Sequence, residues 1–342
     1  MHDPERLAAI LDPVDQRTQP LREDTALQEA MQRCVTQGLD EIPLPGGGET
    51  WQRWQTLAEV AAHDLSLTKL YEGHTDAIAI LRELQSTHLL PSGVGAVWAA
   101  EPPHARVQVS RSENGCAELT GTKAWCSGAA QIDWALLTAW GDHEQPQLAL
   151  VALDQPQVRV GNRGWQAVGM AATASVEVSF EQATAQLIGT PGDYLARPGF
   201  WHGGAGIAAC WYGAATGLAR YLRHFCQQRE NDTHALAHLG AVDAALSSAA
   251  ATLRACAQWI DNQPIADAQL PVRRVRAQVE QACEQVLHHV GRAMGATPFC
   301  RDARFARLAA DLPVFLRQSH AERDLADLGR LVTAQDDPGW QL

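Results

Sequence analysis

A seven-residue segment, Gly121–Ser127, places an aromatic side chain and a hydroxyl two positions apart in the chain. The indole of Trp125 is a flat apolar surface that can pack against a planar ring system. Ser127 and the neighbouring backbone amides are donors that can stabilise charge at the edge of such a ring when the ring is reduced. With Cys126 between them, these residues are candidates for one wall of a cofactor pocket. The simpler alternative is that Trp125 is a core aromatic residue and Ser127 lies in a turn.

Further segments carry glycines, hydroxyls and basic residues in a fixed order along the chain. In sequence order they are Trp165–Phe180, then Gly213–Leu218 with Arg229 eleven residues later, and finally His288–Gly295. Together with Gly121–Ser127, these segments resemble the acyl-CoA dehydrogenases over about residues 55–330. Gly121–Ser127 is similar to that family's G-x-K-x-W-[ILVC]-[ST] segment, and Trp165–Phe180 to the stretch that closes its β-domain.

The resemblance implies bound FAD and assigns positions to it. In the family the tryptophan matching Trp125 packs against the isoalloxazine ring, and the hydroxyl matching Ser127 approaches the N5/O4 edge. Arg229 matches an arginine that reaches the FAD pyrophosphate of a neighbouring subunit, and the alternative is a solvated arginine at a helix end. His288 and Gly291 match a turn that meets the FAD diphosphate and adenosine, although His replaces Gln and one residue is inserted.

The catalytic carboxylate of the family has no equivalent at either of its two usual positions. Those dehydrogenases need a carboxylate that removes an α-proton from the acyl thioester while the flavin takes a hydride. The corresponding positions here hold Pro313 and Ile207. Asp311 is therefore a candidate acid or base, or else it caps a helix that Pro313 helps to start. The family's T-E-P-x-x-G-S-D loop is also altered, since Ala100 replaces its hydroxyl residue and the Gly-Ser-Asp turn is missing.

A histidine near the C-terminus supports a different chemistry on the same fold. Flavin monooxygenases that share the family fold use a helix-borne His and Arg near the flavin, without the dehydrogenase Glu. His320, in the run Arg317–Asp324, is a candidate for that histidine, as a proton donor. The alternative is a charge ladder on a helix surface.

The elements that must position these residues fall into three regions, in which a helical periodicity gives way to strand patterns and then returns. Apolar residues recur at helical spacing in residues 1–90 and again from Pro198, where four amphipathic stripes predict a four-helix bundle. Between them lie seven short runs with strand composition, with a hairpin turn expected at Asn114-Gly115. We therefore predict an α+β fold with an N-terminal helical domain (1–90), a small middle β-barrel (91–195) and a C-terminal four-helix bundle (196–342). The predicted strands are Val94–Trp98, Arg106–Arg111, Cys116–Thr120, Trp134–Trp140, Gln147–Leu153, Gln157–Val160 and Ser175–Phe180.

Composition excludes several classes of function. The 342 residues carry a formal net charge of −12, which disfavours binding to nucleic acid or to an anionic membrane. The eight cysteines include no C-x-x-C pair, so neither a metal site nor a disulfide framework is expected. The N-terminus lacks a signal pattern and no apolar run has the length of a membrane span, so we expect a cytoplasmic protein.

The leading hypothesis is an FAD-dependent oxidoreductase that desaturates an acyl thioester, with acyl-CoA as a candidate, or a related small molecule. The alternatives are a flavin-dependent monooxygenase of the same fold and a non-catalytic relative that has lost the base. Because family members pair their bundles, we expect a homodimer or homotetramer, with an electron-transfer or flavin-reductase partner.

Overall fold

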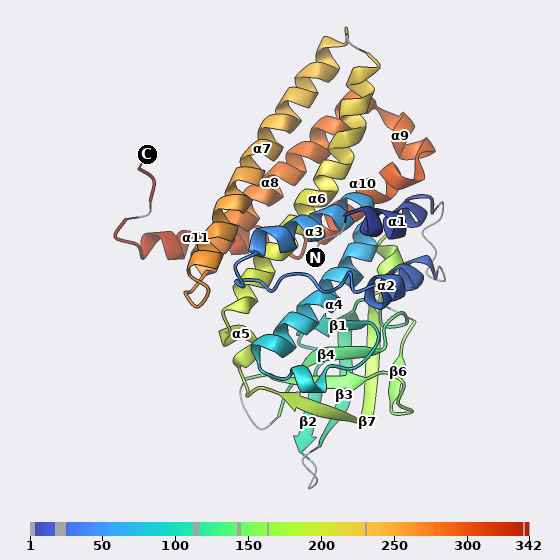
Figure 1. Ribbon diagram of the computed structural model, residues 1–342, viewed down its shortest axis with the longest axis vertical. Coiled ribbons are helices and arrows are strands. Elements are labelled where there is room, and N and C mark those ends of the chain that lie inside the picture. Colours follow the sequence, from blue (N-terminus) through green and yellow to red (C-terminus); the bar gives the residue numbers. More distant parts are fainter. Residues whose placement is uncertain are drawn as a thin grey trace. The chain divides into compact units, whose positions relative to one another are not determined.

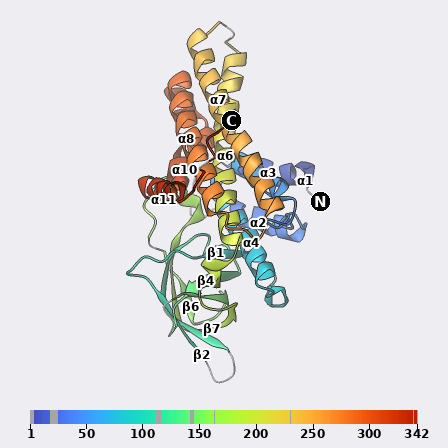
Figure 2. The same cartoon turned by 90° about the vertical axis from the view of Figure 1, so that its left-hand side faces the viewer.

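The computed structural model describes residues 4–17, 25–111, 116–141, 145–162, 164–229, 231–337 and 339–341 (Figures 1 and 2). The chain forms two compact units, each built from two stretches of sequence. The first unit comprises Met1–Ile42 and Ser66–Phe200, and the second comprises Pro43–Leu65 and Trp201–Leu342. The fold is α+β, as predicted. The turn expected at Asn114-Gly115 lies outside the described residues.

The first unit contains all of the described strands. Its helices are α1 (Pro4–Asp15), α2 (Ala26–Thr36), most of α4 (Leu65–Glu83), the 3₁₀ turns η1 (Thr87–Leu89) and η2 (Ala171–Thr173), and α5 (Asp193–Ala196). Its strands are β1 (Gly95–Trp98), β2 (Val107–Arg111), β3 (Ala117–Cys126), β4 (Trp134–Ala139), β5 (Gln147–Ala152), β6 (Val158–Val160) and β7 (Val176–Ile188).

The sheet closes on itself into a small barrel. Its order is β1-β4-β5-β7-β3-β2, with β6 paired to β7. Residues of β2 also bond to the end of β4, because the Val109 amide donates to the Trp140 carbonyl and the Trp140 amide donates to the Val107 carbonyl, both at 2.8 Å. The circuit from β4 through β5, β7, β3 and β2 is thereby closed, and the remaining strands β1 and β6 each pair on one side only.

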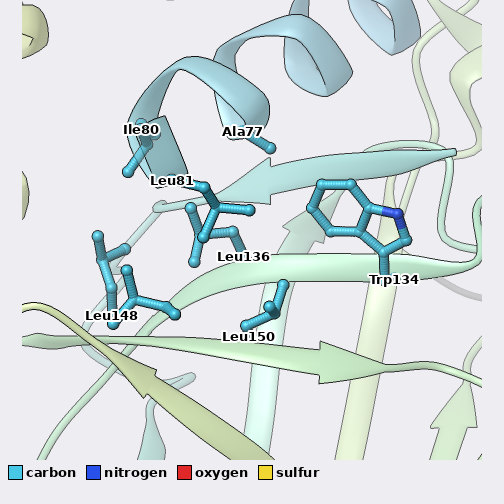
Figure 3. Close-up of a cluster of buried hydrophobic side chains, with 8 residues drawn as sticks. Ala77, Ile80, Leu81, Trp134, Leu136, Leu148 and Leu150 are labelled. Carbon is cyan, nitrogen blue, oxygen red and sulfur yellow. The ribbon is translucent and has the colours of Figure 1, made fainter. Parts of the chain in front are cut away.

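Helix α4 covers one face of the barrel and builds its core (Figure 3). Side chains from one face of α4 pack on alternate residues of three strands, as the periodicities of a helix and a strand require. The cluster consists of Ala77, Ile80 and Leu81 of α4, Trp134 and Leu136 of β4, Leu148 and Leu150 of β5, and Ile188 of β7.

A buried histidine ties α4 to the first strand. The Gly95 amide donates to His74 Nδ1 at 2.9 Å, and the other ring nitrogen, Nε2, lies 3.1 Å from Asp40 Oδ2. Since Nδ1 accepts the hydrogen bond from the Gly95 amide, it carries no proton, and the ring N–H is the one at Nε2. A side chain at Gly95 would collide with the Trp134 ring, since a Cβ there would lie 2.4 Å from it.

Two strands run further than the sequence predicts. Runs ending at Thr120 and Phe180 are expected, but β3 continues to Cys126 and β7 to Ile188. These two strands pair with each other across two register shifts, at Leu119/Thr120 and at Lys123/Cys126. The pairing of β3 with β7 keeps residues in strand conformation that lack strand composition. Each register shift also interrupts the alternation of apolar and polar residues from which strands are predicted.

The second unit contains the predicted bundle. Its long helices are α6 (Gly199–Gln227), α7 (Thr233–Asn262), α8 (Gln269–Met294) and α10 (Ala303–Leu316), with the first two residues of α6 assigned to the other unit. The shorter helices α3 (Thr50–His63), α9 (Ala296–Arg301) and α11 (Glu322–Thr333) complete it. All four predicted stripes lie on the long helices, and their buried residues include Leu218, Val242, Val279 and Leu312.

Helix α7 is the one described helix whose length and composition would allow it to cross a membrane, with a mean hydropathy of 1.3 over its most apolar window. No such helix is expected from the sequence, in which no unbroken apolar run is long enough. A single helix of this kind does not establish a membrane span. In the structure α7 packs along α8.

Candidate functional site

Trp125 lies in a strained backbone conformation next to the end of β3. Its φ is +61°, in the left-handed region that residues other than glycine rarely adopt. The register shift between Lys123 and Cys126 leaves Trp125 out of the regular pairing with β7, and 54% of the residue is exposed. Strain of this kind costs about 1–3 kcal/mol and is typical of functional sites. The alternative of a core aromatic residue is therefore wrong.

A second tryptophan faces the first. The rings of Trp125 and Trp165 lie 5.9 Å apart between centroids and are nearly perpendicular, at 89°. The Trp165 indole N–H donates to the Gly169 carbonyl at 3.1 Å, which fixes that ring to its own loop. An edge-to-face contact of this kind stabilises one orientation of the Trp125 ring.

The loop that carries Trp165 is itself held in an unusual conformation. Met170 and Ala174 have φ values of +57° and +41°, so three of the six left-handed non-glycine residues in the described part of the chain gather at this place. The Gly128 amide donates to the Thr173 carbonyl at 2.8 Å, which joins this loop to the end of β3. Two segments more than 40 residues apart are thus joined at one surface.

Three hydroxyls connect the two segments beneath Trp125. Ser127 Oγ lies 3.0 Å from Ser175 Oγ, which lies 3.0 Å from Thr173 Oγ1. Thr173 Oγ1 donates to the Met170 carbonyl at 2.7 Å. The Ser127 carbonyl accepts from the indole of the buried Trp98 at 3.1 Å, so the backbone of Ser127 is fixed as well.

Cys126 does not share this surface. Its side chain is fully buried and donates to the Lys123 carbonyl at 3.2 Å. Burial raises the pKa of its thiol, which makes it an inert core residue. The sequence predicts that Cys126 contacts a cofactor; because its side chain is buried, only its backbone could do so.

A buried ion pair involves Lys123, two residues before Trp125 in β3. Lys123 is fully buried, and its Nζ donates to Glu101 Oε1 at 2.5 Å and to the Thr138 carbonyl at 2.8 Å. Burial lowers the pKa of this ammonium, against the opposing effect of Glu101. The Trp140 indole donates to the other Glu101 oxygen at 2.8 Å. The altered loop that contains Ala100 is therefore anchored to the barrel through Glu101.

Arg229 and the His288–Gly291 segment belong to the second unit. Arg229 is exposed directly after α6, and its guanidinium lies 4.4 Å from the centre of the Phe225 ring. His288 is exposed on α8, and Gly291 lies further along the same helix. The turn expected at His288–Gly295 is wrong, because α8 continues to Met294. The buried residues Val286 and Val290 hold this last stretch in the bundle.

Asp311 lies inside α10 and is buried. The helix begins at Ala303, where Asp302 accepts from the Phe305 amide at 2.9 Å, so the predicted cap at Asp311 is wrong. Pro313 lies within the last turn of this helix rather than at its start. The apolar face formed by Leu308, Leu312 and Phe315 is buried and extends the helix past the proline.

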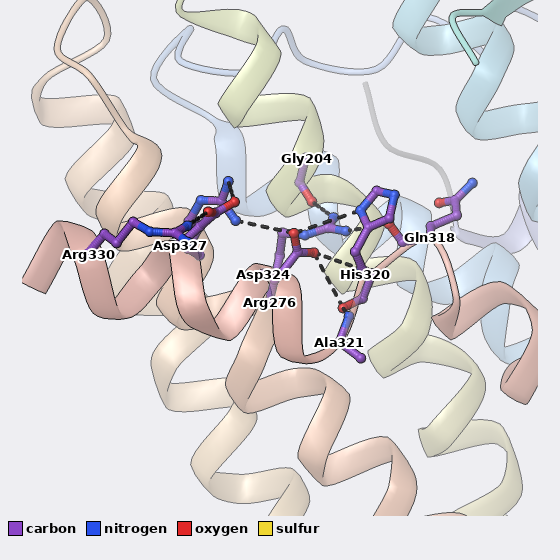
Figure 4. A network of polar contacts seen from close by, with 10 residues as sticks. Gly204, Arg276, Gln318, His320, Ala321, Asp324, Asp327 and Arg330 are labelled. Carbon is purple, nitrogen blue, oxygen red and sulfur yellow. Dashed lines mark hydrogen bonds and ion pairs between the residues drawn. The ribbon is translucent and has the colours of Figure 1, made fainter. Parts of the chain in front are cut away.

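His320 lies in the turn between α10 and α11, and not on a helix as predicted (Figure 4). Its backbone amide donates to Asp324 Oδ2 at 3.0 Å, and its ring Nδ1 lies 3.8 Å from Asp324 Oδ1. The side chain is 67% exposed. Close by, Arg276 Nη1 donates to the Gly204 carbonyl at 2.6 Å. His320 thus keeps an accessible imidazole beside a carboxylate.

The structure brings together Trp125 and Ser127 and adds partners that the sequence analysis does not assign. Trp165, Thr173 and Ser175 are part of a recognised segment, yet their roles depend on contacts across the chain. Lys123 gives no signal of an ion pair, because its partner Glu101 lies 22 positions away. The remaining candidates, Arg229, His288, Gly291, Asp311 and His320, all lie in the second unit.

No protein-family model matches the chain, and no curated protein matches its sequence. Solved structures do match its fold. FMN-bound TdsC from Paenibacillus sp. A11-2 superposes with a TM-score of 0.81 at 19% identity, over 97% of each chain. KijD3 in complex with FMN and a dTDP-linked amino sugar gives a TM-score of 0.81 at 17% identity, over 97% of this chain and 93% of that one.

A third structure of similar fold is the methanesulfinate monooxygenase MsuC from Pseudomonas fluorescens, with a TM-score of 0.76 at 18% identity over 98% of this chain and 96% of that one. TdsC is also described as a dibenzothiophene monooxygenase. At these identities the likeness establishes the acyl-CoA dehydrogenase-like fold of the chain.

Proposed function

We propose that this protein is a flavin-dependent monooxygenase of acyl-CoA dehydrogenase-like fold that uses reduced FMN. The observation that carries the proposal is that the expected flavin wall is present while the expected catalytic carboxylate is absent. In the wall formed by Trp125 and Ser127, Trp125 is exposed and Ser127 partly exposed, whereas the two positions that hold a carboxylate in desaturases hold Pro313 and Ile207. Desaturation of an acyl thioester, the leading hypothesis from the sequence, lacks its base, and the solved structures of similar fold include two monooxygenases.

The residues at this surface fit an isoalloxazine ring. Trp125 offers a half-exposed aromatic face whose direction is fixed by backbone strain and by Trp165. Ser127 offers a hydroxyl and a polar backbone next to that face. Trp125 would pack on the ring and Ser127 would lie at its N5/O4 edge, as in the family that the sequence resembles. When bound, the flavin supplies the electrons that activate dioxygen.

FMN fits this chain better than FAD. The TdsC and KijD3 structures hold FMN. In this chain the residues expected to meet an FAD diphosphate and adenosine, His288 and Gly291, lie on a continuous helix instead of a turn. The Gly-Ser-Asp turn of the β-domain is also absent. FMN lacks the adenylate half of FAD, which His288 and Gly291 would meet.

His320 is the proposed proton donor. Its imidazole is accessible, and its Nδ1 lies 3.8 Å from the Asp324 carboxylate. Its His320→Ala variant should lose oxygen-dependent product formation while it still binds FMN.

The first experiment is a titration of the purified protein with FMN and, separately, with FAD, followed by the absorbance and fluorescence of the flavin. Saturable binding of FMN, weaker binding of FAD, and loss of FMN binding in Trp125→Ala are expected. Absence of binding to either flavin, both in its oxidised form and in its reduced form measured anaerobically, overturns the proposal.

A second experiment separates the three chemistries. The FMN-loaded protein is mixed anaerobically with a panel of acyl-CoA thioesters, and bleaching of the flavin would indicate desaturation. Oxygen consumption is then measured with reduced FMN from a separate reductase, starting with dibenzothiophene and methanesulfinate as probes, together with their oxygenated products. Flavin binding with neither bleaching nor product would favour a non-catalytic relative.

A further inference from the structure

The proton positions in the hydroxyl chain beneath Trp125 follow from counting. Each hydroxyl carries one proton and two lone pairs, and a carbonyl can only accept. Thr173 Oγ1 lies 2.7 Å from the Met170 carbonyl, so its proton points there. Ser175, 3.0 Å from Thr173 Oγ1, must then donate to it. Ser127, 3.0 Å from Ser175 Oγ, must in turn donate to Ser175.

The end of this chain reaches the surface. Thr173 is fully buried and Ser175 is 6% exposed, so both depend on the hydrogen bonds named here. Ser127 is partly exposed, and in the described part of the chain its hydroxyl has no hydrogen-bond partner besides Ser175. Because its one proton is committed inward, Ser127 Oγ presents only lone pairs to the surface beside Trp125.

We propose that Ser127 selects the reduced form of the flavin, because the hydroxyl chain through Ser175 and Thr173 makes it a hydrogen-bond acceptor. This inference rests on the proposed function, which places Ser127 at the N5 edge of the ring. Oxidised flavin has a lone pair at N5, which faces the lone pairs of Ser127 without a proton between them. Reduced flavin has an N5–H, which donates to Ser127.

The preference is of direct use to an enzyme that receives its flavin already reduced. A single neutral hydrogen bond made by one form and denied to the other changes affinity by about tenfold. The protein would therefore capture reduced FMN from a reductase and release oxidised FMN after turnover. Ser175 and Thr173 act as positioning residues, since they set the direction of a proton and do not touch the ring.

The test compares the affinity of the two redox forms. The dissociation constant of oxidised FMN is measured in air and that of reduced FMN anaerobically, for the whole chain and its variants. We expect the wild-type protein to bind reduced FMN about tenfold more tightly, which corresponds to a midpoint potential of bound FMN about 30 mV above that of free FMN.

Thr173→Val keeps the shape of the side chain and removes its hydroxyl. Ser175 is then free to donate to Ser127, Ser127 can donate to oxidised N5, and the affinity ratio should fall towards one. Thr173→Ser keeps the hydroxyl and should keep the ratio. Ser175→Ala releases the Ser127 proton by a second route and should also lower the ratio, which covers the case in which Thr173→Val does not fold.

Thr122→Val is the matched control, because Thr122 Oγ1 of β3 and Ser179 Oγ of β7 form another hydroxyl contact, at 3.4 Å, between the strands that lead into this chain. This variant should keep the wild-type ratio. A purely structural role for Thr173 would weaken both redox forms equally and leave the ratio unchanged, which would overturn the inference. If neither redox form binds to the wild-type protein, the proposed function fails instead.

Discussion

Trp125 combines backbone strain with exposure. Its effect on the stability of the protein and its role in flavin binding can therefore be separated by mutation. We predict that Trp125→Gly is more stable to unfolding than Trp125→Ala by about 1 kcal/mol, because glycine adopts a φ of +61° without steric cost. Both variants should lose FMN affinity, since both lack the indole. Urea unfolding and flavin titration measure the two effects.

The control for this pair is Trp340→Ala. Trp340 is 76% exposed, and its replacement should leave FMN binding unchanged. Equal stability of the glycine and alanine variants would show that the left-handed conformation at Trp125 relaxes without cost.

Lys123 provides a second residue-scale prediction, about stability and pH. Lys123→Met leaves the partly buried Glu101 without its cation and should lower the free energy of unfolding by about 3 kcal/mol. Burial lowers the pKa of Lys123 in the folded protein, so the unfolded chain keeps this proton to higher pH. The stability of the wild type relative to Lys123→Met should therefore increase as pH rises towards the ordinary lysine pKa of about 10.4. Unfolding curves measured across this range test the sign.

Sequence motifs locate the residues of this site but not their conformation. Trp125 and Ser127 are found because their types and spacing match a known segment. The left-handed φ of Trp125 gives no sequence signal. The contact of Trp125 with Trp165 and the hydroxyl chain from Ser127 to Thr173 join positions about 40 or more apart in the sequence. Such contacts depend on the pairing of β3 with β7, which no local pattern specifies.

At the scale of elements, α11 is the helix most dependent on charge. None of its residues is buried, and it is joined to α8 by Arg273, whose guanidinium lies 3.3 Å from Asp324 and 3.1 Å from Asp327. Burial alone would raise the pKa of Asp324. The His320 amide, Arg273 and Arg276 outweigh that effect and hold the pKa below its ordinary value.

We predict that Asp324→Asn loosens α11. Because Asp324 is partly exposed, the expected loss is only about 0.5–1 kcal/mol, seen as faster amide hydrogen exchange in residues 322–333. The folded-state pKa is depressed, so the contribution of Asp324 is present above the ordinary carboxyl pKa and is lost as pH falls through the lower value. The wild-type helix should then exchange as fast as the variant at acidic pH. Asp336→Asn, which removes the same charge beyond the helix, should have no effect.

The elements themselves were predictable where apolar periodicity is strong. The four bundle helices follow buried stripes that include Leu218, Val242, Val279 and Leu312. Helix ends were predictable only where local chemistry decides them. Pro313 reads as a helix start, and His288–Gly295 reads as a turn, yet packing of buried neighbours extends α10 and α8 through both.

At the scale of the whole molecule, the outer face of α7 is a candidate surface for the association of two copies of the chain. Its exposed positions are occupied largely by small residues at helical spacing, namely Ala237, Gly240, Ala244, Ser248, Ala251 and Ala255. A side chain added at Gly240 would meet no atom within 4 Å. Small residues on an apolar helix allow close approach of another helix, and the family that the sequence resembles pairs its bundles. We propose that this face joins two copies of the chain.

Ala251→Glu places a charge at the middle of that face and should convert a dimer or tetramer into a monomer in sedimentation velocity. Ala326→Glu, which adds the same charge to an exposed alanine of α11, should keep the wild-type mass.

If Arg229 acts across the pair of subunits, the Ala251→Glu monomer should also bind flavin more weakly, and Arg229→Ala should reproduce that loss without dissociating the dimer. A wild-type protein that is monomeric at micromolar concentration would exclude both the α7 interface and the role of Arg229. An Ala251→Glu variant that stays dimeric would place the interface on another surface and leave the role of Arg229 to the Arg229→Ala titration alone.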